Sequence, residues 1–124
     1  MRGPKPQPRP MANAIATAIN PPSWLSKHAK HEWRRVMPEI VKRRTLTDAD
    51  LGGLENYCVA IGRVRQLEAL LLDSVDPKLF RMQDAAIKTS RQLAAELGLT
   101  PVSRSRPAVR KDDDDGDANP LNIS

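Results

Sequence analysis

The residues best suited to metal chemistry lie close together, because His28, His31 and Glu32 are spaced to share one side of a helix. A zinc site needs three or four convergent ligands, and the order HxxHE is not the HExxH order of metalloproteases. The chain has no other histidine, and its single cysteine, Cys58, falls on a separate apolar stripe. We therefore predict no metal site and expect these three side chains to face solvent.

Other catalytic patterns are also missing from the sequence. It contains neither the phosphate-binding loop GxxxxGKS/T nor the dinucleotide fingerprint GxGxxG. No serine or cysteine has a plausible base beside it for nucleophilic catalysis. The acidic run Asp112–Asp115 could bind a divalent cation weakly, but contact with a basic partner or with the protein's own basic front fits it better. We predict a protein that is not an enzyme and binds no cofactor.

The charge of the chain is strongly segregated. The net charge is +5, yet residues 1–44 carry +8, residues 45–72 carry −2 and residues 73–101 carry none. Residues 102–111 add +4, and residues 112–124 carry −5. A basic front predicts a polyanionic partner, of which nucleic acid is the commonest. The alternative is a charge distribution that serves solubility only.

Basic side chains in the front segment are the predicted DNA contacts. Lysine and arginine bind phosphates without reading bases, and such binding weakens steeply with salt. The predicted DNA-binding residues are Arg2, Lys5, Arg9, Lys27, Lys30, Arg34, Arg35, Lys42, Arg43 and Arg44.

The length of 124 residues allows one domain, and its composition predicts a small ordered centre. Aromatic residues make up 3% of the chain and it has 11 prolines, so we expect a thin core that gains from partner chains. Three parts are predicted: a flexible basic proline-rich arm (1–22), a helical DNA-binding and oligomerisation domain (23–101) and a disordered basic-then-acidic tail (102–124). Within the arm, the alanine-rich residues 11–20 show no apolar stripe; they could form a transient helical turn or two and are expected to remain mobile unless bound.

Membrane insertion and secretion are not expected. No apolar run approaches the roughly 20 residues of a membrane span, and no apolar segment follows the basic N-terminus as it would in a signal peptide. We therefore expect a soluble, cytoplasmic protein without a membrane partner.

A first helix is predicted from Ser26, a good N-cap, to Arg44. Leu25, Ala29, Trp33 and the pairs 36/37 and 40/41 recur at three- and four-residue steps and form one apolar stripe. Pro38 removes a backbone hydrogen bond and is expected to kink the helix or divide it near Met37.

Two further helices are predicted to form an antiparallel hairpin. Thr47 and Asp50 form a capping-box variant at the start of a helix over residues 48–72. Its Gly52–Gly53 pair suggests the close approach of another backbone, the alternative being that the helix simply tolerates both glycines. Pro77 suits the first position of the next helix, and Gly98 its left-handed C-cap. No strand pattern competes, so the predicted fold is all-α.

Apolar residues along these two helices are predicted to hold copies of the chain together. They are Leu54, Tyr57, Ile61, Val64, Leu71, Phe80, Ile87 and Leu97. An alternative interpretation is a small dimeric DNA-binding regulator, in which the first helix, the turn at residues 43–46 and the second helix form a helix-turn-helix. The sequence supports it weakly, because the turn lacks a central glycine and the second helix carries few residues suited to reading bases.

Several blocks of the sequence resemble the small subunits of phage terminases. The stretch Pro22–Ser26 with Glu32-Trp33 and Pro38-Glu39-Ile40 is similar to one block of that family. Leu46-Thr47 with Asp50, followed by Leu54, Tyr57 and Cys58, is similar to the next. Residues 93–101 with Ser103-Arg104 resemble its closing signature, and the opening Met1-Arg2-Gly3 with Lys5-Pro6 resembles its usual start. These blocks follow one another in order over most of residues 1–106.

The resemblance implies a non-enzymatic subunit of a viral genome-packaging motor, acting in the host cytoplasm. Such subunits form rings through helical hairpins and bind double-stranded viral DNA at the packaging start. They recruit or regulate the terminase large subunit, which carries the ATPase and nuclease. The expected partners are therefore viral DNA, the large subunit and further copies of this chain.

Overall fold

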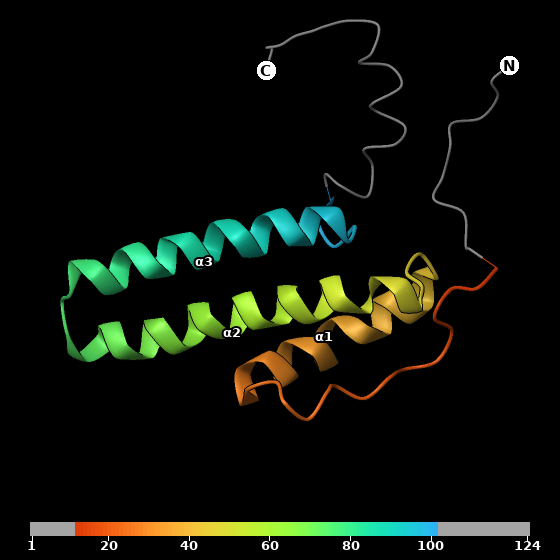
Figure 1. Ribbon diagram of the computed structural model, residues 1–124, viewed down its shortest axis with the longest axis horizontal. Coiled ribbons are helices and arrows are strands. Elements are labelled where there is room, and N and C mark those ends of the chain that lie inside the picture. The colour runs from red at the N-terminus through yellow and green to blue at the C-terminus, as the bar shows by residue number, and fades with distance from the viewer. Residues whose placement is uncertain (1–11, 102–124) are drawn as a thin grey trace, which may run out of the picture.

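Three α-helices make up most of the computed structural model, which describes residues 12–101 (Figure 1). The elements follow in the order α1 (Lys27–Arg43), a 3-10 turn η1 (Asp48–Asp50), α2 (Leu51–Asp73) and α3 (Pro77–Glu96). Helices α2 and α3 form an antiparallel hairpin, and α1 packs beside the first half of α2 (Figure 1). The described residues contain no strand, and the predicted all-α fold is confirmed.

Capping interactions begin and end the helices where the sequence predicts them. The Ser26 hydroxyl accepts a hydrogen bond from the Ala29 N–H at 3.1 Å. Thr47 and Asp50 form the capping box, with the Thr47 N–H donating to the Asp50 carboxylate at 2.8 Å. Asp76 caps α3 immediately before Pro77, and Gly98 takes the left-handed conformation, with φ +73°. Each boundary therefore lies within a few residues of its prediction.

Helix α1 runs through Pro38 as one helix, so the division that the sequence allowed there does not occur. A proline inside a helix removes the hydrogen bond to the carbonyl four residues earlier, here that of Arg34. Both Pro38 and Arg34 are exposed, so water can satisfy the carbonyl that Pro38 leaves unpaired.

The core lies at one end of the molecule, where α1, the first half of α2 and the last turns of α3 meet. Trp33, Leu54 and Cys58 are fully buried there. Helix α3 contributes little besides Ala94 and, just past its end, Leu97. At the opposite end of the hairpin no other described element covers α2 and α3 (Figure 1). The chain thus has a compact base and a thinly packed hairpin end.

Residues 12–22 differ from the unpacked segment that the sequence predicts. They form no helix; instead Ile15 is buried, and its N–H donates to the Leu46 carbonyl at 2.8 Å. The Trp33 indole N–H donates to the Ile19 carbonyl at 2.7 Å. A buried indole needs such an acceptor, and the extended segment supplies it. The alanine-rich segment is therefore part of the base, while residues 1–11 lie outside the described chain.

The close helix approach occurs at Gly62 and not at the Gly52–Gly53 pair, which corrects the sequence interpretation. A Cβ atom built on Gly62 would lie 3.2 Å from the Ala29 nitrogen and 3.1 Å from the Ser26 Oγ. At Gly52 a Cβ would meet nothing within 4 Å, and at Gly53 only the Leu97 side chain, at 3.6 Å. The absence of a side chain at Gly62 is what lets the start of α1 approach α2 closely.

Gly62→Ala is therefore expected to destabilise the fold. Crowding of a packed helix contact costs about 1–3 kcal/mol, which exceeds the gain of about 1 kcal/mol in helix propensity. Gly52→Ala, in open space on the same helix, should instead raise the free energy of unfolding by about 0.5–1 kcal/mol. Urea unfolding followed by circular dichroism measures both, and equal stabilisation by the two variants would show that α1 and α2 do not meet at Gly62.

Candidate nucleic-acid interface

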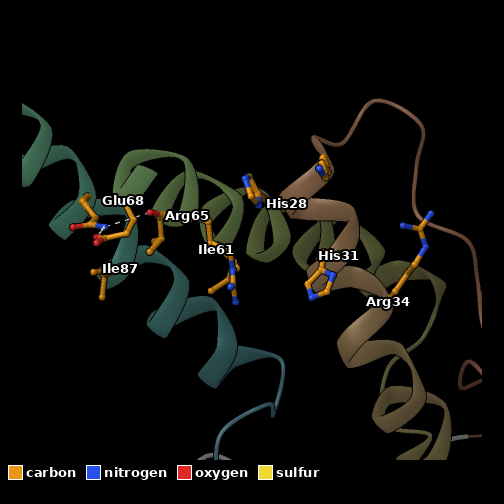
Figure 2. A pocket seen from close by; sticks show the side chains of 10 residues that line it. His28, His31, Arg34, Ile61, Arg65, Glu68 and Ile87 are labelled. Atoms are coloured by element: carbon orange, nitrogen blue, oxygen red, sulfur yellow. Dashed lines mark hydrogen bonds between the residues drawn. The ribbon is translucent and has the colours of Figure 1, made fainter. Parts of the chain in front are cut away.

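A groove of about 940 Å³ opens between the three helices (Figure 2). Its walls come from α1 on one side, α2 in the middle and α3 on the other. The residues that line it are Lys27, His28, His31, Arg34, Ile61, Val64, Arg65, Glu68, Gln83 and Ile87.

The groove carries more positive than negative charge. Lys27 and Arg34 are exposed on α1, and neither forms an ion pair with any described residue. Arg65 adds a third cation from α2. The one carboxylate, Glu68, accepts a hydrogen bond from the Gln83 side chain at 2.8 Å. A groove of this kind attracts anions, because two of its three cations, Lys27 and Arg34, have no acidic partner among the described residues.

Helical spacing explains why these α1 side chains gather on the groove. Ala29, Trp33, Val36 and Ile40 are buried, so they fix which side of α1 faces the core. Residues at three- and four-residue steps share a face, and Lys27, His31 and Arg34 follow one another at such steps beside the buried stripe. Figure 2 shows His28, His31 and Arg34 on α1, with Ile61 and Arg65 on α2 and Ile87 on α3.

A buried carboxylate joins the two helices below the groove. The side chain of Glu32 is 0% exposed and accepts two hydrogen bonds from Arg35, at 2.9 and 2.6 Å. The Tyr57 hydroxyl of α2 donates to the same carboxylate at 2.5 Å, and Arg65 lies 4.0 Å from it. Glu32 therefore ties α1 to α2 and holds the groove cation Arg65 close to its charge.

These contacts decide the protonation states of the cluster. Burial by itself would raise the pKa of Glu32, but the hydrogen bonds from Arg35 and Tyr57, with the charges of Arg35 and Arg65, outweigh it and lower that pKa. Burial, together with the hydrogen bond to Glu32, raises the pKa of Tyr57. Glu32 is thus an anion and Tyr57 a neutral donor near neutral pH. Burial likewise raises the pKa of the Cys58 thiol to about 12, which keeps it protonated and unreactive.

Glu32 is not the solvent-facing residue that the sequence analysis expects. It lies three residues after Ala29 and four before Val36, so it belongs to the buried stripe of α1. That spacing was the signal that could have placed it in the core. Its partner Tyr57 occupies a stripe position of α2, and a buried phenol needs a hydrogen-bond acceptor. Arg65 was the other residue missed, since no pattern in α2 alone points to the groove.

The remaining predicted DNA contacts fall into different surroundings. Arg35 bonds Glu32, and Arg43 pairs with Glu39 at 3.0 Å and donates to the Gly98 carbonyl at 3.4 Å. Two others, Lys42 and Arg44, are exposed and form no ion pair within residues 12–101, whereas Lys30 is half-buried. The other three predicted contacts, Arg2, Lys5 and Arg9, lie outside the described residues.

Arg44 has a backbone conformation that favours glycine. Its φ of 54° lies in the left-handed region, where its N–H caps α1 by donating to the Ile40 carbonyl at 3.0 Å. A non-glycine residue there costs about 1–2 kcal/mol. An arginine at this position thus presents an exposed cation at the end of α1 at the expense of stability.

Comparison with known proteins identifies the family. The family described as "Phage terminase, small subunit" matches residues 29–114, more than half of the chain. The chain belongs to this family. No curated protein and no solved structure matches it. Family membership gives the chain a role in phage DNA packaging and confirms the resemblance seen in the sequence. Members of the family are generally regulatory, non-catalytic subunits.

The residues predicted to join copies of this small-subunit chain have three different placements. Leu54, Tyr57 and Leu97 are buried by the chain itself, so we assign them to the core of the subunit. A second group, Ile61, Val64 and Ile87, lines the groove. Only Leu71 and Phe80 lie near the free end of the hairpin, where α2 and α3 connect.

Residues 12–101 hold neither a cluster of metal-ligating side chains nor a helix suited to a membrane. No group of three or more histidine, cysteine, aspartate or glutamate side chains there is arranged to hold a metal ion. None of the helices in the same residues is long and apolar enough to span a membrane.

Glu32→Gln is expected to lower stability and to change its pH dependence. Glu32 has a lowered pKa in the fold, so it contributes stability above its unfolded pKa, about 4.3, and this contribution is lost as pH falls toward the folded value. The variant should lose about 1–3 kcal/mol at pH 7 and show a flatter decline between about pH 5 and pH 3.

Urea unfolding at pH 7 and at several pH values between about 5 and 3 tests this expectation, with Glu39→Gln as the control. Glu39 pairs with Arg43 at the surface, where an ion pair contributes only about 0–1 kcal/mol. If Glu32→Gln retained the acid sensitivity of the unmodified chain, the buried carboxylate would not be ionised in the fold.

Proposed function

We propose that this chain is the DNA-binding, oligomeric small subunit of a phage packaging motor. In this role it binds double-stranded viral DNA at the packaging start and recruits or regulates the large subunit, which supplies ATPase and nuclease activity in the host cytoplasm. The observation that carries the DNA-binding part is the set of exposed cations around the groove, Lys27, Arg34 and Arg65, of which the first two form no ion pair with a described residue.

The distribution of cations along α1 fits a duplex. Lys27 and Lys42 are fifteen residues apart, which spans about 22 Å of helix at 1.5 Å per residue. Successive phosphates on one DNA strand rise by about 3.4 Å along the helix axis, so the two ends of α1 would reach phosphates several base pairs apart. The strained backbone at Arg44 supports a contact at the second end, since an exposed arginine is kept where glycine would be more stable.

The helix-turn-helix alternative is less well supported by the geometry. A recognition helix reads bases with its N-terminal residues. Here the turn η1 presents the exposed Asp48 and Ala49, and the first turn of α2 presents the exposed Gly52. A carboxylate at this position would repel phosphates, and glycine and alanine offer no group to read base edges.

Exposed apolar residues at the free end of the hairpin support assembly of several copies. Leu72 is 76% exposed and Val75 is 86% exposed, and further apolar side chains near this end of the hairpin are also exposed. These are Leu70, Phe80 and Met82. Large exposed apolar patches mark interaction sites in soluble proteins. A second copy of the chain is the partner that best suits this surface, because it brings an apolar hairpin end of its own. Repeated contacts of this type between copies can close a ring.

Replacing Lys27 and Arg34 by glutamine should weaken DNA binding equally on all duplex sequences. Each lost phosphate contact reduces the slope of log affinity against log salt by about 0.9, so the pair should reduce it by about 1.8. Fluorescence anisotropy with labelled duplexes at several salt concentrations measures the slope.

The matched control replaces Lys78 and Arg81 by glutamine. These two exposed cations lie on the opposite side of α3 from Ile87, by helical spacing, and they do not line the groove. Equal slopes for the two double variants would mean that net charge alone, and not the groove, governs binding.

The double variant Leu72→Lys with Phe80→Glu should dissociate the assembly into subunits of 13.8 kDa without unfolding them. Both side chains are exposed in the subunit, so its own core loses nothing, whereas charges buried between subunits are strongly unfavourable. Sedimentation velocity measures the mass and circular dichroism the helix content. Trp24→Ser, an exposed apolar change elsewhere, serves as control. A variant that kept the sedimentation profile of the unmodified protein would place the interface away from the hairpin end.

A further inference from the structure

We propose that the acidic C-terminal run of the chain, Asp112–Asp115, docks in the basic groove of the same chain and competes there with DNA. The docking part stands on the groove itself, whereas the competition with DNA rests on the proposed function. The occupant is thus a segment of this chain that lies outside the described residues.

The groove has the chemistry to receive an acidic peptide. Its rim carries Lys27, Arg34 and Arg65, and the only carboxylate that lines it, Glu68, is already hydrogen-bonded by Gln83. Its apolar lining comes from Ile61, Val64 and Ile87, of which Ile87 is still 38% exposed. A ligand that suits both parts carries several negative charges with aliphatic groups nearby.

The last thirteen residues of the chain have this composition. They contain five aspartates and no lysine or arginine, and Leu121 and Ile123 follow the acidic run. The other chain segments outside the described residues do not fit. Residues 1–11 carry three basic residues and no acid, and residues 102–111 carry four basic residues and no acid. Like charge excludes both from this groove, which leaves the acidic end as the complementary segment.

The length of the chain allows the contact. Pro101 is the last described residue, and ten residues lie between it and Asp112, so the eleven steps from one to the other reach up to about 36–40 Å when extended. The groove residue Gln83 is eighteen residues before Pro101, or about 27 Å if all of that span were helical. The acidic run can therefore reach any part of the groove.

Tethering makes even a weak contact effective. A segment joined by a short linker has an effective concentration in the millimolar range at its site. A contact with an intrinsic dissociation constant near 0.1 mM would then occupy the groove most of the time and weaken DNA binding by about tenfold. With the acidic segment as competitor, the groove would bind a long, highly charged duplex in preference to polyanions that make only a few contacts.

The two histidines report on the groove directly, because they are the only histidines of the chain and both line it. Protein labelled with carbon-13 at the histidine Cε1 position gives one resonance from each. We expect both resonances to shift at fixed pH when Asp112, Asp113, Asp114 and Asp115 are all replaced by asparagine in the full chain. The control replaces four exposed acids elsewhere, by Asp48→Asn, Asp73→Asn, Asp84→Asn and Glu96→Gln. Identical spectra of the unmodified chain and the tail variant, or equal shifts in the control, would overturn the docking.

A mixing experiment decides whose tail occupies the groove. Labelled tail variant is combined with unlabelled, unmodified chain and the assembly is re-formed. If each tail docks on its own chain, the labelled resonances keep the positions of the tail variant. Movement to the positions of the unmodified chain would show that a neighbouring copy supplies the tail, and would overturn the assignment to the same chain.

Duplex binding tests the competition separately. At equal salt, the tail variant should bind DNA about tenfold more tightly than the four-acid control, which has the same net charge. Equal affinity of these two variants would overturn the competition even if docking occurs. The proposed function fails by a different measurement, an unchanged salt slope after the substitution of Lys27 and Arg34, so the two failures can be told apart.

Discussion

The hydrogen-bonded carboxylate of Glu32 is the constraint on which the cationic surface depends. A buried charge is tolerated only when its partners satisfy it, and here Arg35 and Tyr57 do so from two helices. The bond to Tyr57 fixes the rotation of α1 on α2, because an apolar stripe alone permits small rotations and a hydrogen bond does not. With that rotation fixed, Lys27 and Arg34 lie at the exposed edge of the groove.

Two further contacts, at Gly62 and Trp33, complete the packing of α1 in the base. Gly62 allows the start of α1 to approach α2, and the Trp33 indole reaches across to the Ile19 carbonyl, which holds residues 12–22 against the base. No described element packs on the far end of the hairpin, so Leu72 and Val75 remain exposed to solvent. A chain of this size cannot bury both ends of a long hairpin, and the proposed assembly would cover the end that the single chain leaves exposed.

The sequence predicts elements well and partners of buried groups poorly. Caps such as Ser26, Thr47 and Gly98 depend on neighbours within a few residues, so their roles can be deduced from local spacing. The Gly62 contact, the docking of Ile15 and the groove position of Arg65 depend on residues far apart in the chain, and no local pattern encodes them. Glu32 lies between these cases. Its place in the buried stripe of α1 follows from local spacing, but its hydrogen bond with Tyr57 joins residues far apart in the chain.

The proposed competition between two polyanions for one groove would give the charge segregation of the sequence a physical role. A uniformly basic chain would bind any nucleic acid, because phosphate contacts carry no sequence information. An acidic segment tethered to the same chain must be displaced before another polyanion can bind, so only a ligand that makes many simultaneous contacts binds well. In the proposed assembly, several subunits on one duplex would make such contacts. The phosphate contacts of Lys27, Arg34 and Arg65 in a single subunit would be weak and unspecific. Binding would then become selective for long duplex DNA because several subunits bind the same duplex.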